Sequence, residues 1–373
     1  MLSFHYSVVK VPRTDTLRCR SADRQVYGPI AAPVNGFRAS EPHIPIHTRV
    51  DTLFPPYIAL ADPYIRTVPA AVQTAHTPAR PGENRLPTAR IAIIGGSGLY
   101  DFDGLDNVRT TEIDTPYGPP SAPIVTGNVG GTSVAFLPRH GVGHTISPSE
   151  IPARANIHAL KSIGVTRVVS VSAMGSLKER LRPLDYLVPD QLIDRTRARQ
   201  STFFDNGIVA HVGFADPFCA ELSAAIADAL EEQGANVTRG GTCVVMEGPA
   251  FSTRAESNMY RSWGASAIGM TALPEAKLAR EAELCYATMA AMTDYDVWRE
   301  SGDDVTVETV IANLNRNVEL AKAAIESLLH SDVSNRHCGC GESMANAIIT
   351  SPDAIPEHRR RELDVIAGRY LNP

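Results

Sequence analysis

A glycine-rich turn follows an apolar run near residue 95. The residues IAII at 91–94 lead into Gly95, Gly96, Ser97 and Gly98. Glycines let backbone N–H groups approach an anion, and a serine hydroxyl adds a further donor, as in phosphate-binding loops. The turn lacks the third glycine of a dinucleotide-binding loop and the Gly-Lys-Ser/Thr of a P-loop. We predict a phosphate-binding turn, with a plain tight turn as the alternative.

A second candidate anion site is the segment FLPRHGVGHT, at residues 136–145. Arg139 brings a permanently charged fork of donors suited to phosphate, and His140 is a titratable neighbour. His140 and His144 are four residues apart, which is also the spacing of a metal pair on a helix. The flanking proline and glycines disfavour a helix, and no glutamate completes a zinc motif. We therefore predict anion binding here, with structural histidines as the first alternative.

Small and hydroxyl residues end two further apolar runs. In VVSVSAMGS, Ser172 offers a hydroxyl and Ala173 a backbone N–H to the same anion. In ASAIGMT, Thr271 is another hydroxyl, and Met270 can present a flat, adaptable surface to a ring or sugar. Each signal is weak alone, since small residues at strand ends often serve only close packing.

Two carboxylates flank a tyrosine in MTDYDVW, directly after the apolar run LCYATMAAM. Asp294 and Asp296 thus lie at the end of a buried strand. A salt bridge or a helix cap would be the ordinary structural role for such a pair.

These segments belong to a regular alternation of elements. Strand-length apolar runs occur at residues 90–98, 132–138, 165–175, 185–193, 240–249, 265–271 and 285–296, and helical spacing occurs at 153–164, 219–234, 252–264, 273–284 and 306–330. Alternating strands and helices predict an α/β domain with a mixed, largely parallel sheet flanked by helices. Such sheets bind ligands beyond the carboxyl ends of their strands.

Composition narrows the classes of partner. The 373 residues carry a net charge of −6, which gives no reason to expect nucleic acid or an anionic membrane. No apolar run is long enough to span a bilayer, and no secretory signal is evident, so we expect a cytoplasmic protein. Nearly half of the 27 prolines fall in residues 1–88. We expect this segment to be a poorly ordered extension or an over-long gene start, with a regulatory or targeting arm as the alternative.

Taken together, the motifs resemble those of the 5′-methylthioadenosine phosphorylases, a branch of the trimeric purine nucleoside phosphorylase family. The motifs that carry the resemblance run in family order from Arg90 to His330: IGGSGLYD, DTPYGPPSAP, PRHGVGHT, DQLIDRT, FADPFC, EGPAFSTRAES, MTALPEA and TDYDVW. The resemblance implies one phosphorylase domain at 89–330, followed by a tail at 331–373. It also implies a homotrimer, with a hexamer as the alternative, and no metal or organic cofactor.

The resemblance implies a role for each matching residue. Phosphate would meet Ser97, Arg139, His140, Ser172, the backbone of Ala173, and Thr271. Met270 would lie against the ribose, and Asp294, Tyr295 and Asp296 against the purine. His211 would enter the pocket of a neighbouring subunit, while Ser252 and Val307 would form the end that accepts the methylthio group.

The implied reaction is phosphorolysis of methylthioadenosine to adenine and 5-methylthioribose 1-phosphate, a step of methionine and purine salvage. Cleavage at N9 leaves negative charge on the base, so a protonated Asp294 would donate to N7 while phosphate attacks C1′. A carboxylate also accepts from a 6-amino group, whereas 6-oxopurine enzymes of the family have Asn at this position. The alternatives are a 6-oxopurine or methylthioinosine phosphorylase, a hydrolytic nucleosidase, and a non-catalytic nucleoside-binding protein.

The six cysteines show little ligand spacing. Cys19, Cys219, Cys243 and Cys285 are scattered, and we expect reduced thiols there. Cys338 and Cys340 form a Cys-x-Cys pair similar to pairs that can form disulfides in archaeal and bacterial relatives. Even with His337 the pair supplies one ligand too few for a closed zinc site, so we favour idle or redox-active thiols over a metal. The following PEHRRRELDVIAGRY predicts a short amphipathic helix that docks on the body or on a neighbouring subunit.

Overall fold

The computed structural model describes residues 86, 88–96, 99, 104–299, 307–331 and 333–371. They belong to the second of two units of the chain, Ala79–Pro373. The first unit, Met1–Pro78, lies outside the described residues. The expectation of a poorly ordered extension at 1–88 therefore falls almost entirely outside them too.

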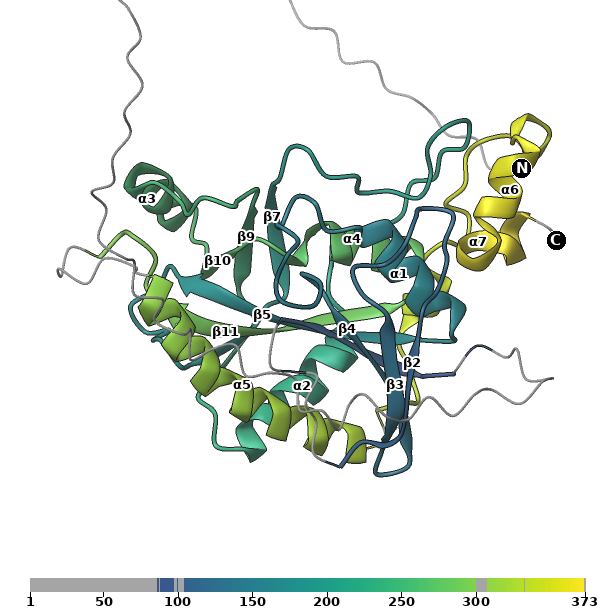
Figure 1. Ribbon diagram of the computed structural model, residues 1–373. Coiled ribbons are helices and arrows are strands. Elements are labelled where there is room, and N and C mark those ends of the chain that lie inside the picture. Colours follow the sequence, from purple (N-terminus) through teal and green to yellow (C-terminus); the bar gives the residue numbers. More distant parts are fainter. Residues whose placement is uncertain are drawn as a thin grey trace, which may run out of the picture. The chain divides into compact units, whose positions relative to one another are not determined.

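Eleven strands of the described residues form one sheet (Figure 1). The main path runs β2–β3–β4–β1–β5–β10–β9–β7, while β11 pairs with β5 and β6, and β6 with β8. The bounds are β1 Ile91–Gly95, β2 Asp106–Thr111, β3 Ile124–Val129, β4 Thr132–Pro138, β5 Arg167–Ser176, β6 Tyr186–Val188, β7 Gln191–Arg195, β8 Val237–Arg239, β9 Thr242–Met246, β10 Ala267–Gly269 and β11 Cys285–Asp294. In the centre of the sheet, the pairs β4–β1, β1–β5 and β5–β11 are parallel. With antiparallel pairs at β2–β3, β3–β4, β5–β10 and β6–β11, the predicted mixed, largely parallel sheet is confirmed.

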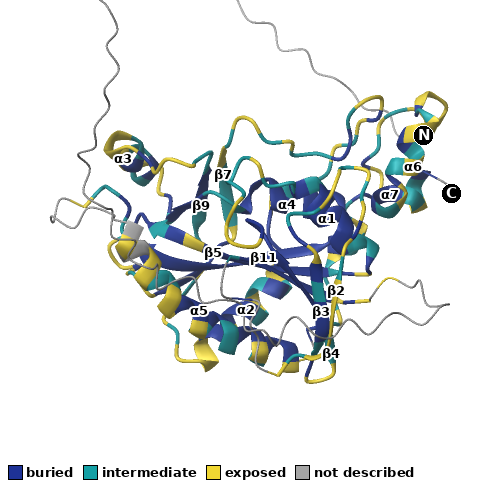
Figure 2. Ribbon diagram, viewed as in Figure 1, coloured by how far each residue is buried: buried dark blue, intermediate teal, exposed yellow. Residues whose placement is uncertain are grey.

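Helices cover both faces of this sheet. Those of the body are α1 Ala153–Ser162, α2 Ala220–Glu232, α3 Arg254–Ser262, α4 Ala272–Glu281 and α5 Val307–His330. α2 and α5 lie on one face and α1 and α4 on the other, with buried strands between them (Figures 1 and 2). None of the described helices is long and apolar enough to cross a membrane.

The period of two in β1 explains these two layers. Ile91 and Ile93 pack in the core that includes α2 and α5, whereas Ala92 and Ile94 pack in the core that includes α1 and α4. Successive side chains of a strand point to opposite faces. A strand that is apolar at every position is therefore buried on both sides.

The tail at residues 333–371 folds onto the body. Where we expected one short helix there are two, α6 Glu357–Glu362 and α7 Asp364–Leu371, with a break at Leu363. Leu363, Ile366 and Leu371 are buried in the same apolar core as α1. We expected the tail helix to dock either on the body or on a neighbouring subunit, and in the structure it packs on the body.

The sequence pattern missed three strands and merged two. Strand β2 is polar except for Val108 and almost wholly exposed, so this edge strand has no apolar run by which to predict it. β3 and the three-residue β8 were missed as well. The run at 185–193 is two strands: β6 pairs with β11 and β8, whereas β7 pairs with β9.

Candidate active site

The carboxyl ends of β5 and β11 form the floor of the candidate site. One edge of β5 pairs with β11 along its length. On its other edge, β5 pairs with β1 up to Ser170 and with β10 only from Gly175. Among the described strands, none pairs with residues 171–174 on that edge. Ser172 is buried, yet Ala173 is exposed in the middle of an otherwise buried strand, so the sheet is open to solvent there.

A β-bulge positions the acidic residues. The register of β11 against β5 shifts between Met292 and Asp294, so Thr293 is an extra residue. Bulges of this kind re-aim the side chain that follows. Asp294 Oδ1 accepts from the backbone N–H of Asp296 at 2.7 Å, which fixes the tight turn between the two acids. Gly175 faces this turn closely, because a Cβ there would lie 2.9 Å from Asp294 Oδ1.

Thr293 completes a short polar chain. Its hydroxyl lies 2.6 Å from Asp294 Oδ2 and 3.3 Å from the carbonyl oxygen of Met174. One hydroxyl proton can serve only one of these acceptors. The shorter contact is the one to Asp294, so the Thr293 hydroxyl donates to Asp294 Oδ2 and fixes the orientation of that carboxyl group.

Asp296 is the more buried of the two acids, and it has a partner that we did not predict. Both of its carboxylate oxygens lie near the hydroxyl of Ser252, at 2.7 and 2.9 Å. Burial raises the pKa of Asp296 above its ordinary value, while hydrogen bonds from Ser257 and Ser252 oppose that shift. The contact with Asp296 adds to the role expected of Ser252, and its place at the methylthio end of the pocket stays a prediction. A carboxylate buried at 8% exposure needs a donor, and Ser252 is the one that the fold supplies.

The predicted hydroxyls meet across the opening in the sheet. Ser172 Oγ on β5 and Thr271 Oγ1 before α4 are 3.0 Å apart, although 99 residues separate them. Thr271 is the N-cap position of α4 but makes no capping hydrogen bond with its side chain. Its hydroxyl is thus committed to Ser172 and not to the helix.

Arg139 lies at this site but is already strongly engaged. Its Nε donates to Glu275 Oε1 at 2.5 Å and its Nη2 to Glu275 Oε2 at 3.1 Å, and both side chains are 2% exposed. Nη1 also donates to the carbonyl of Val171, and Nη2 to Ser170. Sequence reasoning missed Glu275, which lies in the helical pattern after MTALP and carries no local signal. The role of Arg139 as a phosphate ligand stays a prediction.

His140 is buried beside Arg139. Its Nδ1 lies 2.9 Å from the carbonyl oxygen of Ile146, so Nδ1 carries the proton and Nε2 is an acceptor in the neutral ring. Burial lowers the pKa of His140 to about 4. The ring stacks on that of His144 with centroids 4.2 Å apart. A neutral His140 can therefore meet phosphate only where the anion has a P–OH group to donate.

Met270 is held by its surroundings. Gly248 has φ of +70°, which strains any other residue, and a Cβ there would lie 2.6 Å from Met270 Sδ, so the side chain of Met270 would have to move. Arg199 donates to the carbonyl oxygens of Met270 and Leu273 and forms an ion pair with Glu247. This clamp joins the loop after β7 to the turn that carries Met270 and Thr271.

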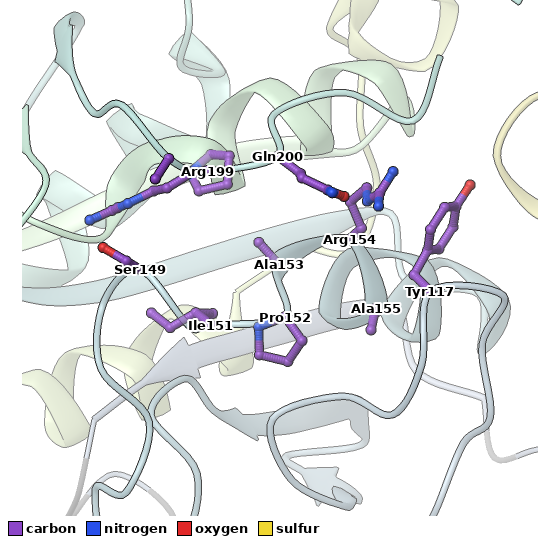
Figure 3. A pocket seen from close by; sticks show the side chains of 11 residues that line it. Tyr117, Ser149, Ile151, Pro152, Ala153, Arg154, Ala155, Arg199 and Gln200 are labelled. Atoms are coloured by element: carbon purple, nitrogen blue, oxygen red, sulfur yellow. The ribbon is translucent and has the colours of Figure 1, made fainter. Parts of the chain in front are cut away.

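A pocket of about 220 Å³ adjoins the clamp. The side chains of Arg199 and Gln200 face the segment from Ser149 to Ala155 across it (Figure 3). Among the predicted site residues whose side chains the structure describes, none lines this pocket. Pro274 does, three residues after Thr271.

The remaining predicted residues are His211, Tyr295, Val307 and Ser97. His211 is exposed, and its backbone N–H donates to Ala347 of the tail. The ring of Tyr295 packs edge-on against Trp298 and under Arg299. Val307 is the first residue of α5, but its side chain is outside the described atoms, as is all of Ser97.

Comparison with known proteins identifies the family of this chain. The family model described as "Phosphorylase superfamily" matches residues 90–330. The S-methyl-5′-thioadenosine phosphorylase of Geobacter sulfurreducens is 54% identical over 282 residues, which are 75% of this chain and 99% of that protein. The enzyme of the same name from Thermosynechococcus vestitus is 51% identical, over 76% of this chain and all of its own length.

The solved structures that resemble this chain include methylthioadenosine phosphorylases as well. The crystal structure of a methylthioadenosine phosphorylase from an Antarctic soil metagenomic library superposes with a TM-score of 0.73 at 46% identity, over 75% of this chain and 99% of that one. A methylthioadenosine phosphorylase from Schistosoma mansoni, in complex with adenine, has a TM-score of 0.65 at 33% identity, over 68% and 96% of the two chains. The chain belongs to the phosphorylase superfamily and, within it, to the S-methyl-5′-thioadenosine phosphorylase family.

Proposed function

We propose that this enzyme cleaves S-methyl-5′-thioadenosine with inorganic phosphate, giving adenine and 5-methylthioribose 1-phosphate. The observation that carries the proposal is the bulged end of β11. It sets Asp294 and Asp296 at one end of an opening in the sheet, whose other end holds the Ser172–Thr271 pair. Gly175, the register partner of Asp294, is three residues from Ser172, or about 10 Å along β5. That separation suits a purine at one end and a phosphate at the other.

The chemistry follows from which bond breaks. As the C1′–N9 bond opens, negative charge collects on the purine, and Asp294 donates a proton to N7. The hydroxyl of Thr293, 2.6 Å from Asp294 Oδ2, orients this carboxyl group. Phosphate attacks C1′ from the Ser172–Thr271 side and takes the sugar. Holding the nucleophile in line contributes about 7 to 11 kcal/mol in favourable cases.

Adenine is the preferred base in this proposal. A 6-amino group offers N–H donors, and ionised carboxylates only accept hydrogen bonds. Asp296, held by Ser252, provides such an acceptor beside Asp294. A site built to pair a polar edge rejects the wrong edge by several orders of magnitude.

The same proposal has four further parts: a homotrimer, the entry of His211 into a neighbouring pocket, the absence of a cofactor and a cytoplasmic location. The exposure of His211 and its support by the tail are compatible with a role outside its own subunit. Replacement His211→Ala should then lower kcat/KM while the sedimentation coefficient of the oligomer stays unchanged. A monomeric enzyme with full activity would refute both the homotrimer and the role of His211 in a neighbouring subunit.

Initial rates on methylthioadenosine, adenosine, inosine and guanosine, each with and without phosphate, test the function. The proposal requires adenine release from methylthioadenosine that depends on phosphate. Turnover in phosphate-free buffer would indicate a hydrolase, and activity confined to inosine and guanosine would indicate a 6-oxopurine phosphorylase. Either result would overturn the proposal.

A further inference from the structure

Four cysteines from distant parts of the chain meet at the base of the sheet. Cys219 is the N-cap of α2, Cys285 is the first residue of β11, and Cys338 and Cys340 lie in the tail. Their sulfur atoms all lie within 4.8 Å of one another, and those of Cys285 and Cys338 are 3.3 Å apart. Three of the four side chains are buried. Our expectation of idle thiols counted only the residues near Cys338, and the fold adds Cys219 and Cys285 to them.

We propose that these four thiolates bind one Zn²⁺ ion in a closed structural site. Zinc takes four sulfur ligands in a tetrahedron with Zn–S bonds of about 2.3 Å, which sets neighbouring sulfurs about 3.8 Å apart. The sulfur separations here bracket that value. A set of four soft thiolates suits zinc over magnesium or calcium. With every ligand position filled by protein, no position remains open for a substrate.

The surroundings favour the charge of such a site. The buried guanidinium of Arg167 is in register with Cys285, and it binds Glu221 and the carbonyl of Asn335. Four thiolates around Zn²⁺ carry a net charge of −2, and Arg167 shares its positive charge between Glu221 and this site. Such contacts from groups around the ligands tune a metal site.

One sulfur already accepts a hydrogen bond from the backbone. The N–H of Leu222, in the first turn of α2, donates to Cys219 Sγ at 3.5 Å. A helix N-terminus also stabilises a thiolate through its partial positive charge.

The site would fasten the tail to the body. The tail segment beside the cysteines is held by Arg336, which donates to the carbonyl of Glu283, and by the backbone N–H of His337, which donates to Glu221. Further along, Ala347 accepts from the backbone of His211. Cys285 and Asp294 lie at opposite ends of β11, about 30 Å apart. The metal therefore stabilises the fold and takes no part in the reaction at Asp294.

The metal content of the full chain tests the site directly. The protein is purified without a metal-chelating tag or chelators and analysed by plasma mass spectrometry. We expect one zinc per chain, and four thiols that react with a thiol reagent only as zinc is released. Co²⁺ in place of zinc should give the visible bands of tetrahedral cobalt–thiolate coordination.

Two variants separate a metal site from ordinary packing. Cys340→Ser should lose the zinc and show a Tm that chelators no longer lower. Cys243→Ala is the matched control, because Cys243 is fully buried but contacts Met174 and lies outside the cluster. It should keep one zinc per chain and the chelator-sensitive Tm of the unmodified protein.

Three results would overturn the proposal. The first is a metal-free protein whose mass under non-reducing conditions shows disulfides among the four cysteines. The second is a metal-free protein whose four thiols react at once. The third is iron in place of zinc, which a red colour and the metal analysis would reveal.

Discussion

Replacement Glu275→Gln tests how the centre of the site is held together. Glu275 forms a two-pronged ion pair with Arg139, and both side chains are 2% exposed. It also accepts from the hydroxyl of Tyr286 at 2.9 Å. Glutamine keeps the size of the side chain but removes its charge and turns an NH₂ group toward either Arg139 or Tyr286. The guanidinium is then a buried cation without its counter-charge.

The magnitude follows from burial. Removing one partner of a buried ion pair costs about 3 to 5 kcal/mol, since the other charge stays desolvated. For a body of about 290 residues this lowers the Tm by about 5 to 8 °C. An exposed pair would contribute less than about 1 kcal/mol. The control is Glu283→Gln, because Glu283 is buried but its partner Arg369 is more than half exposed. It should lower the Tm less.

Phosphate links this stability effect to function. If Arg139 binds phosphate, the anion replaces the lost charge, and the Glu275→Gln variant gains more from it than the unmodified protein does. At 100 times Kd, a ligand that binds only the folded state stabilises by about 2.7 kcal/mol. Thermal unfolding with and without phosphate, at equal ionic strength, measures the difference. Equal phosphate shifts in the variant, the control and the unmodified protein would refute the role of Arg139, and an unchanged Tm would refute the buried pair itself.

Three more predictions concern the reaction and the pH dependence of the stability of the fold. Asp294→Asn should lower kcat/KM for methylthioadenosine by about 10² to 10⁴, as expected for loss of a general acid, and unchanged cleavage would exclude that role. Ser172→Ala and Thr271→Ala should each raise the KM for phosphate. Because the two hydroxyls contact each other, the free-energy change in the double variant should be smaller than the sum of the two single changes. Strict additivity would contradict that coupling. Burial raises the pKa of Glu281 from 4.5 to about 7. Ionising this buried carboxyl therefore destabilises the folded state by an amount that is absent below pH 4.5 and grows as the pH rises to about 7. Glu281→Gln removes this cost, so it should raise the Tm at pH 8 relative to the unmodified protein but not at pH 4.5. Thermal unfolding at the two pH values measures the difference.

The pattern of residues was sufficient for the fold class and for most elements. Apolar runs at strand length and helical spacing at 153–164 and 219–234 depend on local sequence, and the structure has β-strands and α-helices at those places. Edge strand β2 escaped prediction because its polar residues face solvent. The break in the tail helix at Leu363 escaped because one amphipathic pattern runs through both halves.

For the candidate site too, local sequence predicted the residue types, whereas long-range contacts decided their partners. Sequence alone determined which residue types end each strand, and so it named Ser172, Thr271, Asp294 and Asp296 before their contacts were known. Only the tertiary structure decided their partners, because hydrogen bonds and ion pairs such as Arg139–Glu275 join residues more than a hundred positions apart. The four-cysteine cluster shows this most clearly. Spacing along the chain gave two neighbouring thiols, and the three-dimensional packing of α2, β11 and the tail brought the other two within reach of the same ion.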